Sequence, residues 1–483
     1  MSGARKRLLE FWSGAGGGGE VLHVAYPLIL SNMSFTVQVF VDRVFLTWYS
    51  PEAVAGAVTG VFVTWVLIGL FSSTGEYATT FVAQYLGAGR AQRIGPTLWQ
   101  GFYFSLASGL LVAALSPLMG PMARLGVHDP GVIEAELAFG GTLMRGAFPA
   151  ILMATLSSFF AGRGATLTIL LVNVLATVVN VVLDYCWIFG NAGFPRAGAA
   201  GAAYATIVSQ VVGSLCYVVL ILRPAHRSEF ATGSGWRFER PLFGRLLRYG
   251  LPTGLTASLE IFAFALFMQV VGRIGTEPLA ASSVAFSLNT IVFFPMLGLG
   301  IGVSSLVGRY LGAGRPDVAE RSTWSAFWVS LVYMSACGAL YVFAPHLLLE
   351  PFGVGGDHLA FLGIAELAVV LLRFVAVYSI FDMMNLIFAA GLKGAGDTAY
   401  PLTLTIGLSW FAMLIPVYLA CVRGSAGVYV AWSFASLYVI LLGLLMLRRF
   451  RAGRWRSLRV IEPSPPELDA LEAAPVGRLL ATE

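Results

Sequence analysis

Carboxylic side chains inside hydrophobic stretches are the residues of this sequence best placed to do chemistry. Five lie well inside such stretches: Asp42, Glu76, Asp184, Glu260 and Asp382. If the stretches cross a membrane, each charge costs at least ~2.5–3.5 kcal/mol at a helix centre, so a function is the default expectation. A buried carboxylate either binds a hard cation with neighbouring oxygen atoms or takes up a proton. Both reactions would couple the protein to an ion gradient.

Polar residues accompany most of these carboxylates at helical spacing, which places them on one helix face. The longest stripes are Asn173, Thr177, Asn180 and Asp184, and Ser31, Ser34, Gln38 and Asp42. Shorter ones are Tyr378, Asp382 and Asn385, then Thr253, Thr256 and Glu260, then Thr206 and Ser209. Lipid offers no hydrogen bonds, so such faces must line a helix interface or a wet cavity. The serines and threonines also fit simple interhelical hydrogen bonding, and Glu76, without a stripe, stays open between structure and function.

The elements that must position these side chains are membrane helices. The chain has 483 residues, of which 57% are hydrophobic and only 11% charged, with a mean hydropathy of +0.79. This composition excludes soluble, disordered and disulfide-scaffold proteins. Twelve apolar runs each exceed the ~20 residues of a membrane helix, and they are 21–48, 53–83, 96–119, 132–158, 167–190, 199–222, 249–272, 279–306, 323–345, 359–389, 400–421 and 426–447. The runs are too long and too uniformly apolar for barrel strands, so an all-α integral membrane protein is predicted.

The basic residues predict the orientation. The two termini and every second loop lie on one side of a twelve-span chain, and that side carries 23 of the 30 Lys and Arg residues. Positive loops face the cytoplasm, so both termini are predicted to be cytoplasmic. The pI of 9.0 reflects this bias and leaves no soluble basic face for nucleic acid. The segment after Arg448 reads as a membrane-surface stretch followed by disorder, and Gly14 to Gly19 reads as a flexible linker.

An internal repeat divides the twelve spans into six and six. Tyr85-Leu86-Gly87-Ala88-Gly89-Arg90 recurs 225 residues later as Tyr310-Leu311-Gly312-Ala313-Gly314-Arg315, and Pro27 and Pro252 have the same offset. The predicted units are 21–222 and 249–447, joined by a cytoplasmic loop 223–248 and flanked by segments 1–20 and 448–483. Because six is even, the two units run parallel across the membrane. Parallel repeats with a site at their interface are typical of secondary transporters.

The sequence resembles the multidrug and toxic compound extrusion (MATE) family over about residues 20–450. The resemblance rests on Gly391-Leu392-Lys393-Gly394-Ala395-Gly396-Asp397-Thr398 and on the two Leu-Gly-Ala-Gly turns. It implies a V-shaped pair of six-helix lobes and drug efflux driven by Na⁺ or H⁺.

The resemblance also implies two ion sites. Glu260, Tyr378 and Asp382 are similar to the C-lobe cation site of the NorM-type subgroup, and Glu260 and Asp382 are then possible Na⁺ ligands. Asp42, Asn180, Asp184 and Thr206 are similar to the N-lobe site of bacterial and archaeal members. Candidates for the substrate cavity are Gln38, Phe286, Phe293, Phe294 and Met296.

These features favour a secondary antiporter that exports amphipathic, cationic drugs or toxic metabolites in exchange for Na⁺ or H⁺. The expected setting is the inner membrane of a bacterium, as a monomer in the lipid bilayer, with the coupling ion but no cofactor. The alternative is a lipid-linked oligosaccharide flippase of the same superfamily, although the stripes are acidic rather than basic. An enzyme is not expected, because the five histidines sit at span ends and in loops without ligand spacing.

Overall fold

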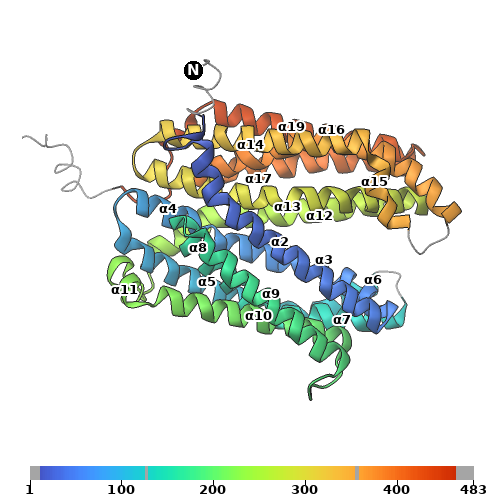
Figure 1. The fold of residues 1–483 in the computed structure, drawn as a ribbon, viewed down its shortest axis with the longest axis horizontal. Helices are drawn as coiled ribbons and strands as arrows, with labels where there is room; N and C mark the ends of the chain where they lie inside the picture. Colours follow the sequence, from blue (N-terminus) through green and yellow to red (C-terminus); the bar gives the residue numbers. More distant parts are fainter. Residues whose placement is uncertain (1–10, 126–128, 354–357, 464–483) are drawn as a thin grey trace, which may run out of the picture.

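The computed structural model describes residues 11–125, 129–353 and 358–463, and within them it contains helices and no strands (Figure 1). We call the first group of helices the N-lobe: α2 (Gly18–Tyr49), α3 (Pro51–Glu76), α4 (Ala78–Gly87), α5 (Ile94–Leu115), α6 (Met119–Leu125), α7 (Pro130–Arg145), α8 (Ala147–Arg163), α9 (Thr166–Phe189), α10 (Gly198–Ile221) and α11 (Pro224–Phe230). The second group is the C-lobe: α12 (Arg240–Ile274), α13 (Thr276–Gly312), α14 (Pro316–Phe343), α15 (Pro345–Leu349), α16 (His358–Ala395), α17 (Ala399–Leu408), α18 (Ile415–Val417) and α19 (Val428–Arg451).

The membrane spans agree with the twelve predicted from the sequence. Among the described residues, eleven helices, some of them merged across short breaks, are long and apolar enough to cross a membrane. The twelfth span is the pair α7 and α8, which bends by 51°. The bend falls at Gly146, where a Cβ atom would come within 2.3 Å of Ile207 Cδ1, so only glycine lets α10 approach the break so closely. The prediction of twelve transmembrane helices is confirmed.

The two copies of the repeat form the same turn. In the first copy the backbone N–H of Arg90 donates to Tyr85 O at 2.9 Å, and in the second that of Arg315 donates to Tyr310 O at 2.8 Å. Gly89 and Gly314 have φ values of +68° and +69°, in the left-handed region that favours glycine. Two parallel six-helix repeats are therefore present, and we call the end of the molecule that carries these turns the terminal face and the opposite end the distal face.

The repeats also contact each other reciprocally at the terminal face. A Cβ atom on Gly87 would lie 1.9 Å from Arg309 O, and one on Gly312 would lie 2.2 Å from Gln84 O. Gly87 and Gly312 are repeat equivalents, and so are Gln84 and Arg309. The ends of α4 and α13 therefore cross with their backbones in contact. In each repeat the equivalent glycine lies against the equivalent backbone oxygen of the other repeat.

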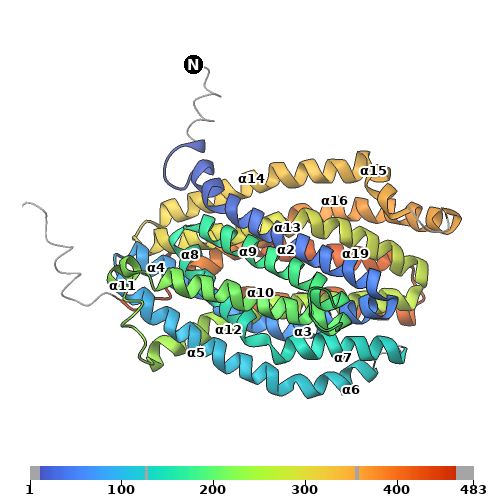
Figure 2. The same ribbon diagram turned by 60° about the horizontal axis from the view of Figure 1, so that its bottom comes forward.

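The hydrophobic cores show that the lobes are joined at the terminal face. Two core clusters mix the lobes: one packs Val21 and Val24 of α2 with C-lobe residues, and the other packs Leu242 and Leu246 of α12 with N-lobe residues. The two clusters nearer the distal face each draw their buried residues from one lobe. In Figure 1 the two groups of helices meet at the left and lie apart at the right, the V shape of the fold. Figure 2 shows α14 and α15 at one edge and α5–α7 at the other, with α2, α10, α12 and α13 between them.

The start of the chain corrects one prediction. The sequence predicts a flexible linker at Gly14 to Gly19, but Gly16, Gly17 and Gly18 are buried. A Cβ atom on Gly16 would lie 2.7 Å from Val318 O of α14, so the glycines allow a close approach to the C-lobe. The helix α2 accordingly begins at Gly18, before the predicted start of the span.

The close approach of α12 to α3 gives a test of how the lobes are held together. A Cβ atom on Gly254 would lie 2.2 Å from Leu70 O, whereas one on Gly244 of the same helix would meet nothing within 4 Å. We expect Gly254→Ala to destabilise the protein by about 1–3 kcal/mol through overpacking. The matched change Gly244→Ala should be neutral or stabilising by up to about 1 kcal/mol. Thermal unfolding in detergent measures both, and equal melting temperatures for the two variants would contradict the close contact.

Candidate functional site

The N-lobe candidates lie where α2 runs beside α9. The two polar stripes predicted from the sequence meet face to face: Ser34 Oγ donates to Thr177 Oγ1 at 3.0 Å, and Asn173 Nδ2 donates to Ser31 Oγ at 2.6 Å. Tyr217 of α10 adds a hydroxyl that donates to Asn173 Oδ1 at 3.4 Å. These hydrogen bonds fix the rotation of the two helices about their axes.

Further toward the distal face, the same helices bring two carboxyl groups together. The side chains of Asp42 and Asp184 are in hydrogen-bonding contact. In the amide orientation that satisfies both of its ends, Asn180 donates to Asp42 Oδ1 at 3.0 Å and to Asp184 Oδ2 at 3.1 Å. Its oxygen then accepts from the backbone N–H of Thr206 at 3.3 Å. The four residues predicted for the N-lobe site are therefore one cluster.

The environment of this cluster limits its charge. Asp184 and Asn180 are fully buried, and Asp184 Oδ1 is buried without a hydrogen-bond partner. Two carboxylates in contact cannot both be ionised at low cost unless a cation joins them. The cluster thus offers an oxygen-rich site for one proton or one small cation. Asp42 is only partly buried, which gives the site an opening on the α2 side.

The C-lobe candidates come from α12 and α16. The side chain of Glu260 is exposed on α12, and its charge interacts with that of Asp382, which is partly buried on α16. Tyr378, one turn before Asp382, is 5% exposed, and its hydroxyl has no hydrogen-bond partner. Its ring lies 6.4 Å from that of Trp432 on α19, and Trp432 stacks on Phe286 at 4.7 Å. Trp432 is fully buried, so this aromatic group belongs to the core of the C-lobe, and Phe286 is its partly exposed member.

The structure adds a basic residue that the sequence placed in a loop. The helix α16 continues to Ala395, so Lys393 lies in its last turn instead of the predicted loop 390–399. The Lys393 ammonium interacts electrostatically with Glu76 of the N-lobe and Glu260 of the C-lobe. The absence of a proline between Asp382 and Lys393 was the available signal, although Gly391 lies there, and the predicted end of the span was about two turns too early.

The remaining cavity candidates have different surroundings. Phe286, Phe293 and Phe294 of α13 are partly buried, whereas Met296 is 4% exposed and packs in a core cluster that contains Val24. Gln38 is 8% exposed on α2, on the stripe that leads to Asp42. Of these residues, the phenylalanines present the most accessible apolar surface.

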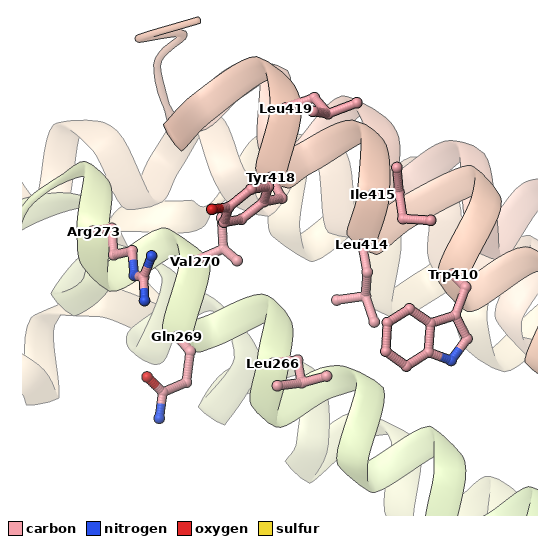
Figure 3. Close-up of a pocket in the computed structure, with 9 residues that line it drawn as sticks. All are labelled: Leu266, Gln269, Val270, Arg273, Trp410, Leu414, Ile415, Tyr418 and Leu419. Atoms are coloured by element: carbon pink, nitrogen blue, oxygen red, sulfur yellow. The ribbon is translucent and has the colours of Figure 1, made fainter. Parts of the chain in front are cut away.

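One pocket lies away from these residues. It has a volume of about 420 Å³ and lies between α12 and the span that contains α17 and α18 (Figure 3). Its walls are mostly apolar, and Gln269, Arg273 and the Tyr418 hydroxyl add polar groups. None of the predicted ion or substrate residues lines it, and among the described residues no three His, Cys, Asp or Glu side chains gather as a metal site.

Comparison with known proteins agrees with this architecture. The family model described as MatE matches residues 27–186 and 252–419, one segment in each repeat. A probable multidrug resistance protein NorM of Thermotoga maritima is 25% identical over 450 residues, covering 92% of this chain and 94% of the relative. A protein of the same description from Brucella suis is 29% identical over 446 residues, covering 90% and 92%.

The fold is also that of solved transporters. The structure of a multidrug resistance MATE family transporter in its outward-facing conformation superposes with a TM-score of 0.82, at 20% identity, covering 91% of this chain and 97% of that one. A MOP superfamily transporter from Pyrococcus furiosus gives a TM-score of 0.81 at 20% identity. With the MatE model covering both repeats, the chain belongs to the MatE family of membrane transporters.

Proposed function

We propose that this transporter is a secondary antiporter that exports amphipathic, cationic compounds in exchange for Na⁺ or H⁺. It works in a bacterial inner membrane as a monomer, with the terminal face toward the cytoplasm. The positive charge of the loops at that face supports this orientation. The curated relatives are described as multidrug resistance proteins, which supports a small-molecule drug substrate.

The observation that carries the proposal is the contact between Asp42 and Asp184. Interhelical hydrogen bonding needs no charged group, and hydroxyls already supply it about two turns away through Ser34 and Thr177. Two touching carboxyls with a free buried oxygen are suited to a cation that arrives and leaves. The coupling ion binds here, in the C-lobe at Glu260 and Asp382, or at both.

The C-lobe residues support a cationic substrate. Glu260 presents an exposed carboxylate, Asp382 adds a second, and Phe286 of the same lobe, which stacks on the buried Trp432, is partly exposed. An organic cation is attracted by carboxylates and by aromatic faces. If the substrate and the ion share these carboxylates, binding of one displaces the other, which is the simplest form of exchange.

Alternating access then follows from the way the lobes are joined. The mixed cores close the terminal face, so the conformation described here is open toward the distal face. An ion drives the exchange only if it binds the two conformations unequally. Exchange of one monovalent ion for one monovalent organic cation moves no net charge, so the concentration gradient of the ion drives it. Each tenfold gradient supplies about 1.4 kcal/mol, enough for a roughly tenfold gradient of substrate.

The alternative substrate is a lipid-linked oligosaccharide. Its pyrophosphate group requires basic residues, and Lys393 is the basic side chain near the carboxylates of Glu76 and Glu260. The surplus of acidic groups there favours the cation.

The deciding experiment is transport by the purified protein in proteoliposomes, with the Na⁺ gradient and the pH gradient imposed separately. We expect a fluorescent organic cation to accumulate against its gradient when one of the two ion gradients is present. Accumulation that depends on neither gradient would refute the proposal, and so would transport of a pyrophosphate-linked lipid but of no cation.

A further inference from the structure

The segment that follows α19 leaves the C-lobe and crosses to the N-lobe. Gly453, with φ of +73°, turns the chain at the end of α19. Trp455 is then fully buried, stacks on Phe450 at 4.7 Å and donates through Nε1 to Phe450 O at 2.8 Å. Further on, Val460 and Ile461 are 1% and 7% exposed within the core cluster that contains mainly N-lobe residues. We call residues 454–462 the C-terminal strap.

The strap corrects the prediction of a membrane-surface segment after Arg448. Trp455, Val460 and Ile461 pack on protein, and the backbone N–H of Val460 donates to Gln84 Oε1 of α4 at 2.9 Å. The remainder of the predicted tail, from residue 464, lies outside the described residues.

The strap ends in a dense ionic contact. The Glu462 carboxylate accepts a hydrogen bond from the Tyr85 hydroxyl at 2.6 Å and pairs with Arg90 at 2.6 Å, Arg245 at 2.5 Å and Arg93 at 3.2 Å. Arg90 also donates to the backbone oxygen of Glu462 at 2.8 Å. The carboxylate therefore joins the turn of the first repeat to the start of α12, the first helix of the second.

These partners keep Glu462 ionised. Burial acts to raise the pKa of Glu462, but the Tyr85 hydroxyl, a backbone hydrogen bond and Arg245 outweigh it and lower the pKa to about 2 from an ordinary 4.5. A lowered pKa stabilises the folded state above the ordinary pKa, and the stabilisation is lost as the pH falls through the folded pKa. We expect the difference in melting temperature between the wild type and Glu462→Gln to be constant from pH 8 to about pH 5 and to disappear by about pH 2. A difference that is already lost at pH 6 would contradict the ion pairs.

The other end of the chain makes the equivalent contact in the other direction. Glu20, in the first turn of α2, accepts from the Tyr310 hydroxyl at 2.7 and 2.8 Å and pairs with Arg309. Ser325 of α14 donates to Gly16 O at 2.8 Å. Thus the first described residues of the N-lobe bind the C-lobe, and the strap at the end of the C-lobe binds the N-lobe.

The repeat explains why the strap is needed on one side. Tyr85 and Tyr310 are equivalent, and the equivalent of Glu20 is Arg245. At Tyr310 the carboxylate comes from helix α2 itself, through Glu20. At Tyr85 the equivalent helix, α12, carries Arg245 instead, and Glu462 of the strap supplies the negative charge.

We propose that the C-terminal strap is a latch that holds the lobes closed at the terminal face and must release the N-lobe before the transporter opens there. A contact made in only one of two conformations shifts the population toward that one. The strap is anchored in the C-lobe through Trp455 and through the pair of Glu462 with Arg245 of α12. Its Val460 and Glu462 also bind α4 and the turn after it in the N-lobe, so parting of the lobes at this face breaks this second set of contacts. This inference rests on the proposed function only in assuming that the lobes alternate.

The test measures the opening of the terminal face directly. Spin labels are attached through Ala225→Cys in the N-lobe and Ala313→Cys in the C-lobe, both exposed at this face, with the native cysteines replaced by alanine. In the wild type, without substrate or ion gradient, we expect one short distance. In Glu462→Gln we expect the population with a longer distance to rise by about ten-fold or more, since hydrogen bonds to a charged group are lost.

Two further variants make the test specific. Glu320→Gln removes the ion pair between Arg456 of the strap and α14 of its own lobe, and it should leave the distances unchanged because Trp455 still anchors the strap there. Arg245→Glu combined with Glu462→Gln copies the arrangement at Glu20 into the first repeat and should restore the short distance. The proposal is overturned if Glu462→Gln keeps the wild-type distances, if Glu320→Gln opens the face equally, or if the double variant stays as open as Glu462→Gln. A failed transport assay would leave these distances unaffected, so the two proposals fail separately.

Discussion

Replacing Asp382 with asparagine is expected to abolish ion-driven accumulation of substrate while leaving the protein folded. If the C-lobe carboxylates bind the coupling ion, the variant loses the free energy of the ion gradient, about 1.4 kcal/mol for each tenfold difference in ion concentration. With a tenfold ion gradient, the accumulation ratio should then fall roughly ten-fold, to the level of passive exchange. The same loss is expected for Glu260→Gln, because the two charges interact across α12 and α16.

The measurement is uptake of a fluorescent cation into everted membrane vesicles. Glu366→Gln is the matched control, since Glu366 is an exposed carboxylate on the same helix, nearer the distal face. It should keep wild-type accumulation. If both Asp382→Asn and Glu260→Gln keep full accumulation, the coupling ion does not bind in the C-lobe.

Asp42→Asn is expected to remove the dependence of efflux on pH or Na⁺ that comes from the N-lobe. The asparagine can still hydrogen-bond Asn180 and Asp184, so the helices α2 and α9 should stay in place. What changes is the need for a shared cation, because only one carboxylate of the pair remains. We therefore expect substrate binding to persist and the response to the ion gradient to fall by about ten-fold or more, as expected for losing one charged interaction.

Thr177→Val provides the control for Asp42→Asn. It breaks the 3.0 Å hydrogen bond with Ser34 in the same stripe but changes no charge. A loss of about 1 kcal/mol in stability or less, with normal ion dependence, is expected. If Asp42→Asn and Thr177→Val behave alike in the transport assay, the N-lobe cluster serves only to join the helices.

The fold could be predicted in some detail because lipid imposes simple demands. Every long apolar run became a helix or, at Gly146, a bent pair of helices, and the repeat at Tyr85 and Tyr310 folded into identical turns. Helical spacing predicted that the stripes on α2 and α9 each line a helix interface or a wet cavity, because lipid offers no hydrogen bonds, and the structure shows that they face each other. The clustering of Asp42, Asn180 and Asp184 follows from that pairing.

What the sequence could not provide are contacts between segments far apart in the chain. Lys393 was assigned to a loop because hydropathy ends the span early, although the helix continues past it. The strap is arginine-rich and ends in a proline-rich tail, a composition typical of exposed chain, and only the position of Gln84 and Tyr85 beneath it explains why Val460 and Ile461 are buried. Hydropathy indicates whether a segment prefers lipid or water, but it does not indicate which other segment of the chain it packs against.

The reciprocal contact between Gly87 and Gly312 has a consequence for the ancestry of the chain. Gly87 meets Arg309, and its equivalent Gly312 meets Gln84, the equivalent of Arg309, which is the pattern of a two-fold symmetric dimer interface. A single six-helix unit with this glycine could therefore pair with a second copy of itself before the gene was duplicated. Fusion then freed the halves from having identical sequences, and the opposite charges of Glu20 and Arg245 at matching positions are a difference that a homodimer could not have carried.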